Sequence, residues 1–237
     1  MTRIPLTIAL MFLSAAFLSP TAGAGASGHE VDRAGRPAFD SAIHRISPKL
    51  RRRMSSWRPG CPVHWRDLRV LRVTTWGFDG RAHRGWLMLH RSQARRIRWV
   101  MRVLYRRKYP IMRMRLVDAY GSDDHRSMNA DNTSAFNCRF VAGTSRWSQH
   151  AYGTAIDLNP VENPYVSGSH VSPPAGRPYA DRPRAPGVIH RNGYVVRAFA
   201  RVGWEWGGNW SSPRDYQHFS VTGTCAPPPP PISAPSG

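Results

Sequence analysis

Residues 68–89 read LRVLRVTTWGFDGRAHRGWLML, and this stretch decides the fold class. Side chains alternate in a strand-like pattern over residues 68–73, and residues 85–89 form a second largely apolar run. A turn signal, Phe-Asp-Gly at residues 78–80, lies between the two runs. The stretch therefore predicts an antiparallel hairpin.

A helix is predicted directly after this hairpin, from an N-cap at Ser92 to Tyr105. Apolar side chains recur there at helical spacing, at Ala94, Ile97, Val100, Met101 and Leu104. We expect further strands at residues 112–120, around Asp157 and around His218, a helix at 194–202 closed by Gly203, and loops at 121–137 and 160–186. Short strands and helices mixed in this way predict an α+β fold, with a small antiparallel sheet flanked by helices.

The first 26 residues are expected to be an export signal. Arg3 precedes an apolar run at residues 4–18, and small residues at 21–26 offer cleavage sites. The run is shorter than the roughly 20 residues that span a bilayer, and no cysteine lies at its end. We therefore expect a secreted protein without stable membrane insertion.

Residues 61–225 are expected to form one catalytic domain with its own core. A basic segment or linker at 27–60 would precede it, and a proline-rich disordered tail at 226–237 would follow. The three cysteines are too far apart for a zinc knuckle. Outside the cell one pair would oxidise and leave the third free, and the sequence leaves every pairing open among Cys61, Cys138 and Cys225.

The net charge of +20 comes almost entirely from arginine. A field of this size favours polyanions, and anionic cell-wall polymers are the ones that an exported protein would meet. The base composition of the genome would explain the arginine bias equally well. A nucleic-acid partner is not expected, because the export signal is present and a recognisable binding motif is not. We expect a monomer.

Two segments carry the chemistry. Residues 148–157 read SQHAYGTAID, and residues 215–219 read DYQHF. On a strand, Asp157 would project opposite its apolar neighbours, and a glycine before it would let the chain bring His150 to the same point. Two histidines and one aspartate suit zinc and leave a fourth position for water, so we predict a metal site of His150, Asp157 and His218.

Asp215 lies three residues before His218, close enough to move a proton without being a ligand. An arginine would stabilise a developing oxyanion, and Arg139 is preferred over Arg126 because it is closer to the metal segment. Asp215 could instead form an exposed ion pair with Arg214. Tryptophans at 204, 206 and 210 would suit either a substrate groove or the core.

Both segments resemble the zinc D-Ala-D-Ala carboxypeptidase family, which includes VanY-type carboxypeptidases, the vancomycin-resistance dipeptidase and phage L-alanyl-D-glutamate endopeptidases. The family's first motif is Ser-x-His-x-x-Gly-x-Ala-x-Asp, and its second is an acidic residue three places before a histidine. The chain matches every fixed position, with Ser148, His150, Gly153, Ala155, Asp157, Asp215 and His218. The resemblance covers about residues 61–221, including the segments 132–139, 159–165 and 203–208.

The resemblance implies a Hedgehog/DD-peptidase-like fold with the zinc site on the sheet. It also implies zinc held by His150, Asp157 and His218, with Asp215 as the general base. Many relatives have glutamate in place of Asp215, and many place the oxyanion arginine after a tyrosine where this chain has glycine. The identity of the oxyanion-stabilising arginine therefore stays open between Arg139, which is preferred, and Arg126.

The expected activity is hydrolysis of an amide bond in peptidoglycan stem peptides, outside the cell and at the cell wall. Both a D,D-carboxypeptidase and an L-Ala-D-Glu-type endopeptidase fit, and Ser148 is expected to orient a ligand or the substrate. The alternative is a non-catalytic cell-wall-binding protein with a relic zinc site. That alternative predicts loss of Asp215, which the chain retains.

Overall fold

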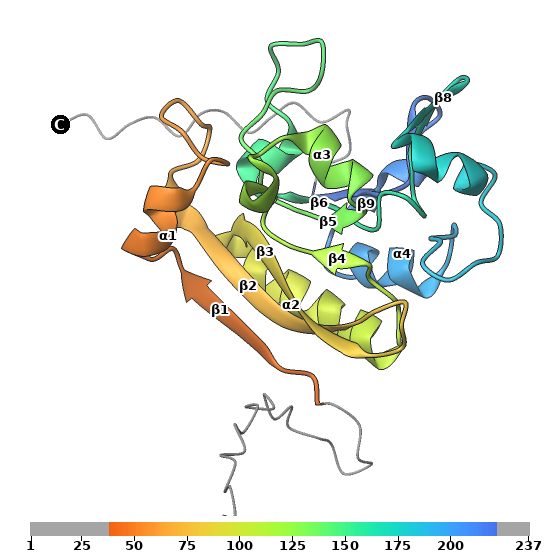
Figure 1. The fold of residues 1–237 in the computed structure, drawn as a ribbon, viewed down its shortest axis with the longest axis horizontal. Coiled ribbons are helices and arrows are strands. Elements are labelled where there is room, and N and C mark those ends of the chain that lie inside the picture. The colour runs from red at the N-terminus through yellow and green to blue at the C-terminus, as the bar shows by residue number, and fades with distance from the viewer. Residues whose placement is uncertain (1–37, 222–237) are drawn as a thin grey trace, which may run out of the picture.

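The computed structural model describes residues 38–221, and its largest sheet is built on the predicted hairpin. Strands β2 (Leu68–Trp76) and β3 (Ala82–His90) pair antiparallel along their whole length, which confirms the hairpin. Strand β1 (Ser41–Arg45) pairs with the other edge of β2 (Figure 1). The folded part therefore begins upstream of residue 61, within the segment where a basic linker is predicted.

Helix α2 (Arg91–Arg106) covers one face of this sheet, as Figure 1 shows. The predicted apolar stripe of α2 is buried and shares one core with Leu71 and Leu87 of the sheet. The predicted N-cap is wrong, because His90 takes that place and its ring nitrogen accepts from the Ser92 backbone N–H at 3.4 Å. The helix thus begins at the residue after the strand ends.

A second sheet carries the two sequence motifs. Its strands are β6 (Ala155–Asp157), β11 (His218–Ser220) and β9 (Glu205–Trp206), all antiparallel, with β11 in the middle. Helix α4 (Tyr194–Ala200) packs on this sheet, where Phe199 stacks on Phe219 with ring centroids 3.9 Å apart. The predicted helix and both motif strands are confirmed.

The opposite face of the large sheet packs against the chain segment that leads into the site. Val70 and Met88 share a second core with Phe136 and Cys138. The Phe136 backbone N–H donates to the Met88 carbonyl at 2.9 Å. The hairpin thus supports the segment that carries Arg139.

Several loops predicted from the sequence contain short elements, and the predicted strand at 112–120 is wrong beyond its first residues. Asp123 caps an unpredicted helix by accepting from the Arg126 backbone N–H at 2.9 Å. The remaining elements are α1 (Pro48–Arg53), η1 (Trp65–Asp67), β4 (Arg113–Met114), η2 (Val117–Tyr120), α3 (Asp124–Asn129), β5 (Asn132–Thr133), η3 (Gln149–Tyr152), β7 (Tyr165–Ser167), β8 (His170–Ser172), η4 (Pro174–Tyr179), η5 (Gly207–Asn209) and β10 (Arg214–Asp215).

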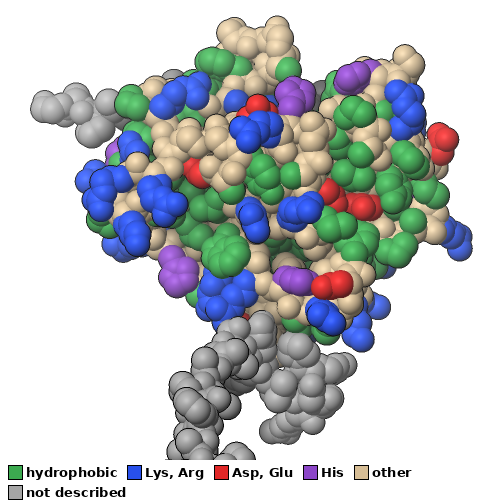
Figure 2. All heavy atoms as spheres, in the orientation of Figure 1, with side chains coloured by type: hydrophobic (Ala, Val, Ile, Leu, Met, Phe, Trp, Pro, Cys, Tyr) green, Lys and Arg blue, Asp and Glu red, His purple; other side chains and the backbone are tan. Residues whose placement is uncertain are grey.

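The fold is α+β, with three small antiparallel sheets and one parallel pair of strands in place of a single sheet. Within residues 38–221 no helix combines the length and the apolar character needed to cross a bilayer. The predicted export signal and proline-rich tail fall outside this described part, as does Cys225. Basic side chains far outnumber acidic ones on the face shown in Figure 2.

A disulfide joins Cys61 to Cys138, which are 77 residues apart in the sequence. Among the described cysteines, this is the oxidised pair that the sequence left open. We expect the Cys61→Ser/Cys138→Ser variant to lose about 2–5 kcal/mol of unfolding free energy, because its unfolded chain is less constrained. Denaturant titration with and without a reductant measures this loss. Reductant should lower the midpoint of the wild type and of the matched control Cys225→Ser, but leave the double variant unchanged. Equal midpoints for the double variant and the oxidised wild type would contradict the prediction.

Two carboxyl groups, of Asp131 and Glu162, lie buried together away from the motifs. Burial, followed by repulsion from Asp131, raises the pKa of Glu162 from 4.5 to about 8. Burial also raises the pKa of Asp131, although the Val161 backbone N–H donates to its Oδ1 at 2.9 Å. The folded chain therefore holds a proton here that the unfolded chain releases in mild acid.

Stability should consequently fall as the pH rises from about 4.5 towards 8, because the unfolded state binds fewer protons over that window. Glu162→Gln removes this titration and is expected to raise the unfolding free energy at pH 8 by about 1–3 kcal/mol, with little change near pH 4. Denaturant titrations across this pH range test the prediction. The exposed Glu205→Gln variant should follow the wild type. Parallel curves for Glu162→Gln and the wild type would show the prediction to be wrong.

Candidate metal centre

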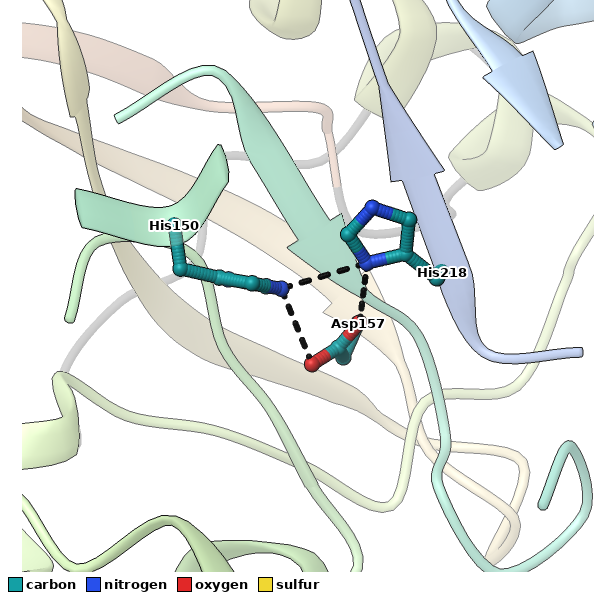
Figure 3. A group of neighbouring side chains, drawn as sticks. All are labelled: His150, Asp157 and His218. Atoms are coloured by element: carbon teal, nitrogen blue, oxygen red, sulfur yellow. Dashed lines mark hydrogen bonds and ion pairs between the residues drawn. The ribbon is translucent and has the colours of Figure 1, made fainter. Parts of the chain in front are cut away.

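Three side chains from separate elements meet at one point of the second sheet. His150 comes from η3, Asp157 ends β6 and His218 begins β11. His150 Nε2 lies 3.1 Å from Asp157 Oδ2, and His218 Nδ1 lies 3.1 Å from Asp157 Oδ1 (Figure 3). The two histidine nitrogens are 3.3 Å apart, and all three residues are buried. The structure thus brings together the three predicted ligands.

Gly153 explains how His150 reaches this point. It ends η3 in the left-handed region, at φ 67°, and a Cβ there would lie 2.5 Å from the His90 backbone nitrogen. That nitrogen donates to the Gly153 carbonyl at 2.9 Å, which ties η3 to the end of β3. Ser148 caps the same turn, because its Oγ accepts from the His150 backbone N–H at 3.3 Å. Only glycine fits this close approach.

Asp157 is held by backbone pairing on both sides. It is the register partner of His218 across the β6–β11 pair, which places both side chains on one face. On its other side, its N–H and carbonyl bond to the Ser134 backbone at 2.9 Å and 3.0 Å. The neighbouring Ile156 and Leu158 are fully buried in the core, as the alternation predicts.

The ring orientation of His150 is also fixed. Its Nδ1 lies 2.5 Å from the Ala135 carbonyl, and since a carbonyl only accepts, Nδ1 carries the proton and donates. Nε2 then presents a lone pair towards Asp157 and His218. A backbone carbonyl behind a histidine is a common second partner of metal-binding imidazoles.

The electrostatics of the cluster favour an ionised carboxylate. Burial opposes the charge on Asp157, but the two histidines outweigh it and hold the pKa of Asp157 well below its ordinary value. Burial likewise disfavours protonated His150, yet Asp157 raises its pKa. Burial lowers the pKa of His218. One atom from each residue, all within 4.8 Å of one another, forms a set of two nitrogens and one oxygen, which fits zinc.

Asp215 lies beside this cluster in the wall of a cavity of about 700 Å³. Burial, then repulsion from Asp157, raises the pKa of Asp215 to about 8. Its Oδ1 is buried and finds no hydrogen-bond partner among the residues that the structure describes. Asp215 is not exposed, and no ion pair joins it to Arg214 among the described residues, so the interpretation of Asp215 as an exposed ion pair is wrong.

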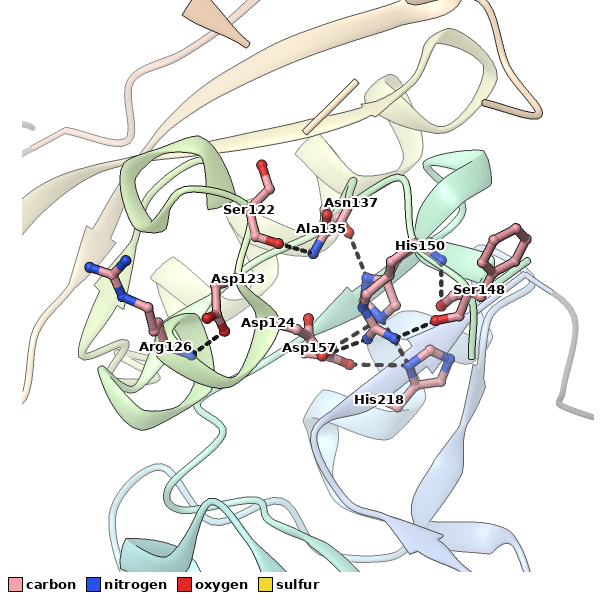
Figure 4. Close-up of polar contacts among 12 residues, drawn as sticks. Ser122, Asp123, Asp124, Arg126, Ala135, Asn137, Ser148, His150, Asp157 and His218 are labelled. Carbon is pink, nitrogen blue, oxygen red and sulfur yellow. Dashed lines mark hydrogen bonds and ion pairs between the residues drawn. The ribbon is translucent and has the colours of Figure 1, made fainter. Parts of the chain in front are cut away.

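Of the two candidate arginines, Arg139 is the one that lines the cavity, and Arg146 lines it as well. Arg139 Nη2 lies 2.8 Å from Asp124 Oδ2, and both side chains are about three-quarters buried. Arg126 is not part of the cavity wall, and its backbone N–H caps α3 through Asp123 (Figure 4). Sequence reasoning missed Asp124, because α3 was predicted as a loop. The acidic pair at 123–124 after a serine is the signal that could have indicated a helix start.

The tryptophans divide between cavity and core. Trp210 lines the cavity, with its ring centroid 5.5 Å from that of His218. Trp204 and Trp206 are buried, and their Nε1 atoms donate to Gln93 Oε1 and to the Tyr216 carbonyl. Ser148 also lines the cavity, although its hydroxyl oxygen accepts from a backbone N–H of the motif itself.

A buried His/Asp/His cluster in the wall of a cavity, with a carboxyl group and an arginine beside it, is an arrangement typical of metal-dependent hydrolases. Among known families, the D-alanyl-D-alanine carboxypeptidase family model matches residues 142–221, which confirms the resemblance. The match supports a hydrolase, a peptidoglycan peptidase of the carboxypeptidase kind. It contains the cluster and Asp215, whereas Arg139 lies three residues before it. No curated protein and no solved structure shows a significant match to the chain.

Proposed function

We propose that this chain is a secreted zinc peptidase that hydrolyses an amide bond in peptidoglycan stem peptides at the cell wall. One observation carries the proposal: the His150–Asp157–His218 cluster shares a cavity with Asp215, on the segment that matches the peptidase family. We also propose a Hedgehog/DD-peptidase-like fold, in which the zinc site lies on the small antiparallel sheet. Anionic wall polymers are the proposed partners of the basic surface.

Zinc would be held by His150 Nε2, a carboxylate oxygen of Asp157 and His218 Nδ1. When bound, it supplies Lewis acidity towards a carbonyl oxygen and towards water. Ser148 acts indirectly, because it fixes the backbone of the turn from which His150 projects.

Asp215 moves the proton. Its carboxyl group, in the cavity wall and with Oδ1 free of hydrogen-bond partners among the described residues, takes a proton from the attacking water and then gives it to the leaving amine nitrogen. Bond formation at the carbonyl carbon and cleavage of the C–N bond thus leave Asp215 in its starting state. A relic binding site would have no use for a carboxyl group in this place.

Arg139 stabilises the negative charge that develops on the carbonyl oxygen. Its ion pair with Asp124 fixes the guanidinium, and both residues line the cavity. Arg139→Lys is expected to lower kcat/KM by about 100-fold, because an ammonium cannot bind Asp124 and an oxyanion at once in the planar way of arginine. Arg126→Lys is the matched control and should keep wild-type kcat/KM. A larger loss in the Arg126 variant would reverse the assignment.

The test of the proposed function is digestion of purified muropeptides by the zinc-loaded protein, with the products weighed by mass spectrometry. Release of a single terminal D-alanine identifies a D,D-carboxypeptidase, whereas cleavage inside the stem identifies an endopeptidase. No product from any stem peptide would contradict the proposal.

A further inference from the structure

Gln217 lies between Asp215 and His218 and is a buried polar side chain that the proposed chemistry does not yet use. Only 2% of the residue is exposed, and it lines the cavity. Its carbonyl accepts from the Leu158 backbone N–H at 3.0 Å, so the pairing of the strands fixes its backbone. Asp215, two residues before it, lines the same cavity.

The side-chain amide of Gln217 has a defined orientation. Gln217 and Asp215 both line the cavity, and the Gln217 amide lies close enough to the Asp215 carboxyl to offset part of the rise in its pKa that burial causes. A carboxylate only accepts, so the NH₂ end of the amide faces Asp215 and Oε1 is turned away from it. Within residues 38–221, this buried Oε1 has no hydrogen-bond partner.

The chain has two other glutamines, and in both the side-chain oxygen Oε1 accepts a hydrogen bond. Gln93 Oε1 accepts from Trp204 Nε1 at 3.2 Å, and Gln149 Oε1 accepts from Thr154 Oγ1 at 3.0 Å. Buried acceptors in folded proteins are nearly always paired, and an exception at a site calls for a ligand or water. The open acceptor of Gln217 is therefore a feature of the cavity rather than of the core.

We infer that Gln217 Oε1 accepts a hydrogen bond from the N–H of the scissile amide, and so restricts the substrate to secondary amides. The inference rests on the proposed function and deepens it. The leaving nitrogen must take its new proton on its lone pair, from Asp215. An acceptor that holds the existing N–H, on the side chain next to Asp215, turns that lone pair towards Asp215. Esters and N-alkylated amides lack this hydrogen and lose the contact.

The experiment compares two forms of one stem peptide, the natural amide and an ester in which oxygen replaces the scissile N–H. Gln217→Met keeps the side-chain volume but has no hydrogen-bonding oxygen. We expect this variant to lower kcat/KM for the amide about 10–100-fold and to leave the value for the ester within about twofold of wild type. Zinc content, measured in parallel, should equal that of the wild type.

Gln93→Met is the matched control, since it removes a buried glutamine outside the cavity and should not change the ratio of the two rates. If Gln217→Met does not fold, Gln217→Asn retracts the same amide by one methylene and should show the same selective loss. Equal losses on amide and ester, or no loss on the amide, would overturn the inference while the proposed function stands. Wild-type protein that cleaves neither substrate would overturn both.

Discussion

Replacing His218 with alanine is expected to remove the bound zinc and to lower stem-peptide hydrolysis by at least about 1,000-fold. His218 is one of the three residues of the cluster proposed to hold zinc, and its loss leaves only His150 and Asp157. Two protein ligands do not make a stable zinc site when three are the usual minimum for catalysis. Zinc per chain after dialysis, together with kcat/KM on muropeptides, measures both effects.

The exposed His44→Ala variant is the matched control and should keep its zinc and its activity. The loss in His218→Ala must also be separated from unfolding, because His218 lies in the central strand of its sheet. A folded His218→Ala protein that still holds one zinc per chain and cleaves at the wild-type rate would disprove this assignment of the ligands.

Asp215→Asn is expected to lower kcat by about 100- to 10,000-fold while zinc content stays at the wild-type level. Asparagine has nearly the shape of aspartate but cannot take a proton from water or deliver one to the leaving amine. Asp215 is not a member of the three-residue cluster, so the variant should bind metal as well as the wild type does. Steady-state kinetics and metal analysis on one preparation separate the two roles.

The exposed Asp181→Asn variant, outside the cavity wall, controls for the loss of one negative charge. Loss of zinc in Asp215→Asn would mean that Asp215 is a ligand. Retention of full activity would mean that another group moves the proton.

The parts of the fold that local pattern determines were predictable. The β2–β3 hairpin and helix α2 follow from alternation, a turn signal and an apolar stripe, each within about 20 residues. The clustering of His150, Asp157 and His218 was also predictable, because both motifs have fixed spacing and the first contains a glycine, which lies at φ 67°. Helix α3 escaped prediction because its six residues bury only Ser127 and so have no apolar stripe.

Long-range contacts account for most of what the sequence could not predict. Strand β1 forms only against β2, almost 30 residues later, and its own residues are half-exposed or exposed. The choice of Cys138 as the partner of Cys61 depends on packing behind the hairpin. The unpaired Oε1 of Gln217 could not be predicted either. It depends on the orientation of one side-chain amide, which a pattern of residue types does not determine.

The most direct test of the account is a zinc titration of metal-stripped wild-type protein with muropeptides as substrate. We expect no hydrolysis in the presence of chelator, and activity that rises in proportion to added zinc and levels off at one zinc per chain. Hydrolysis that continues at full rate in the chelator, or zinc-loaded protein that releases no product from any stem peptide, would contradict it.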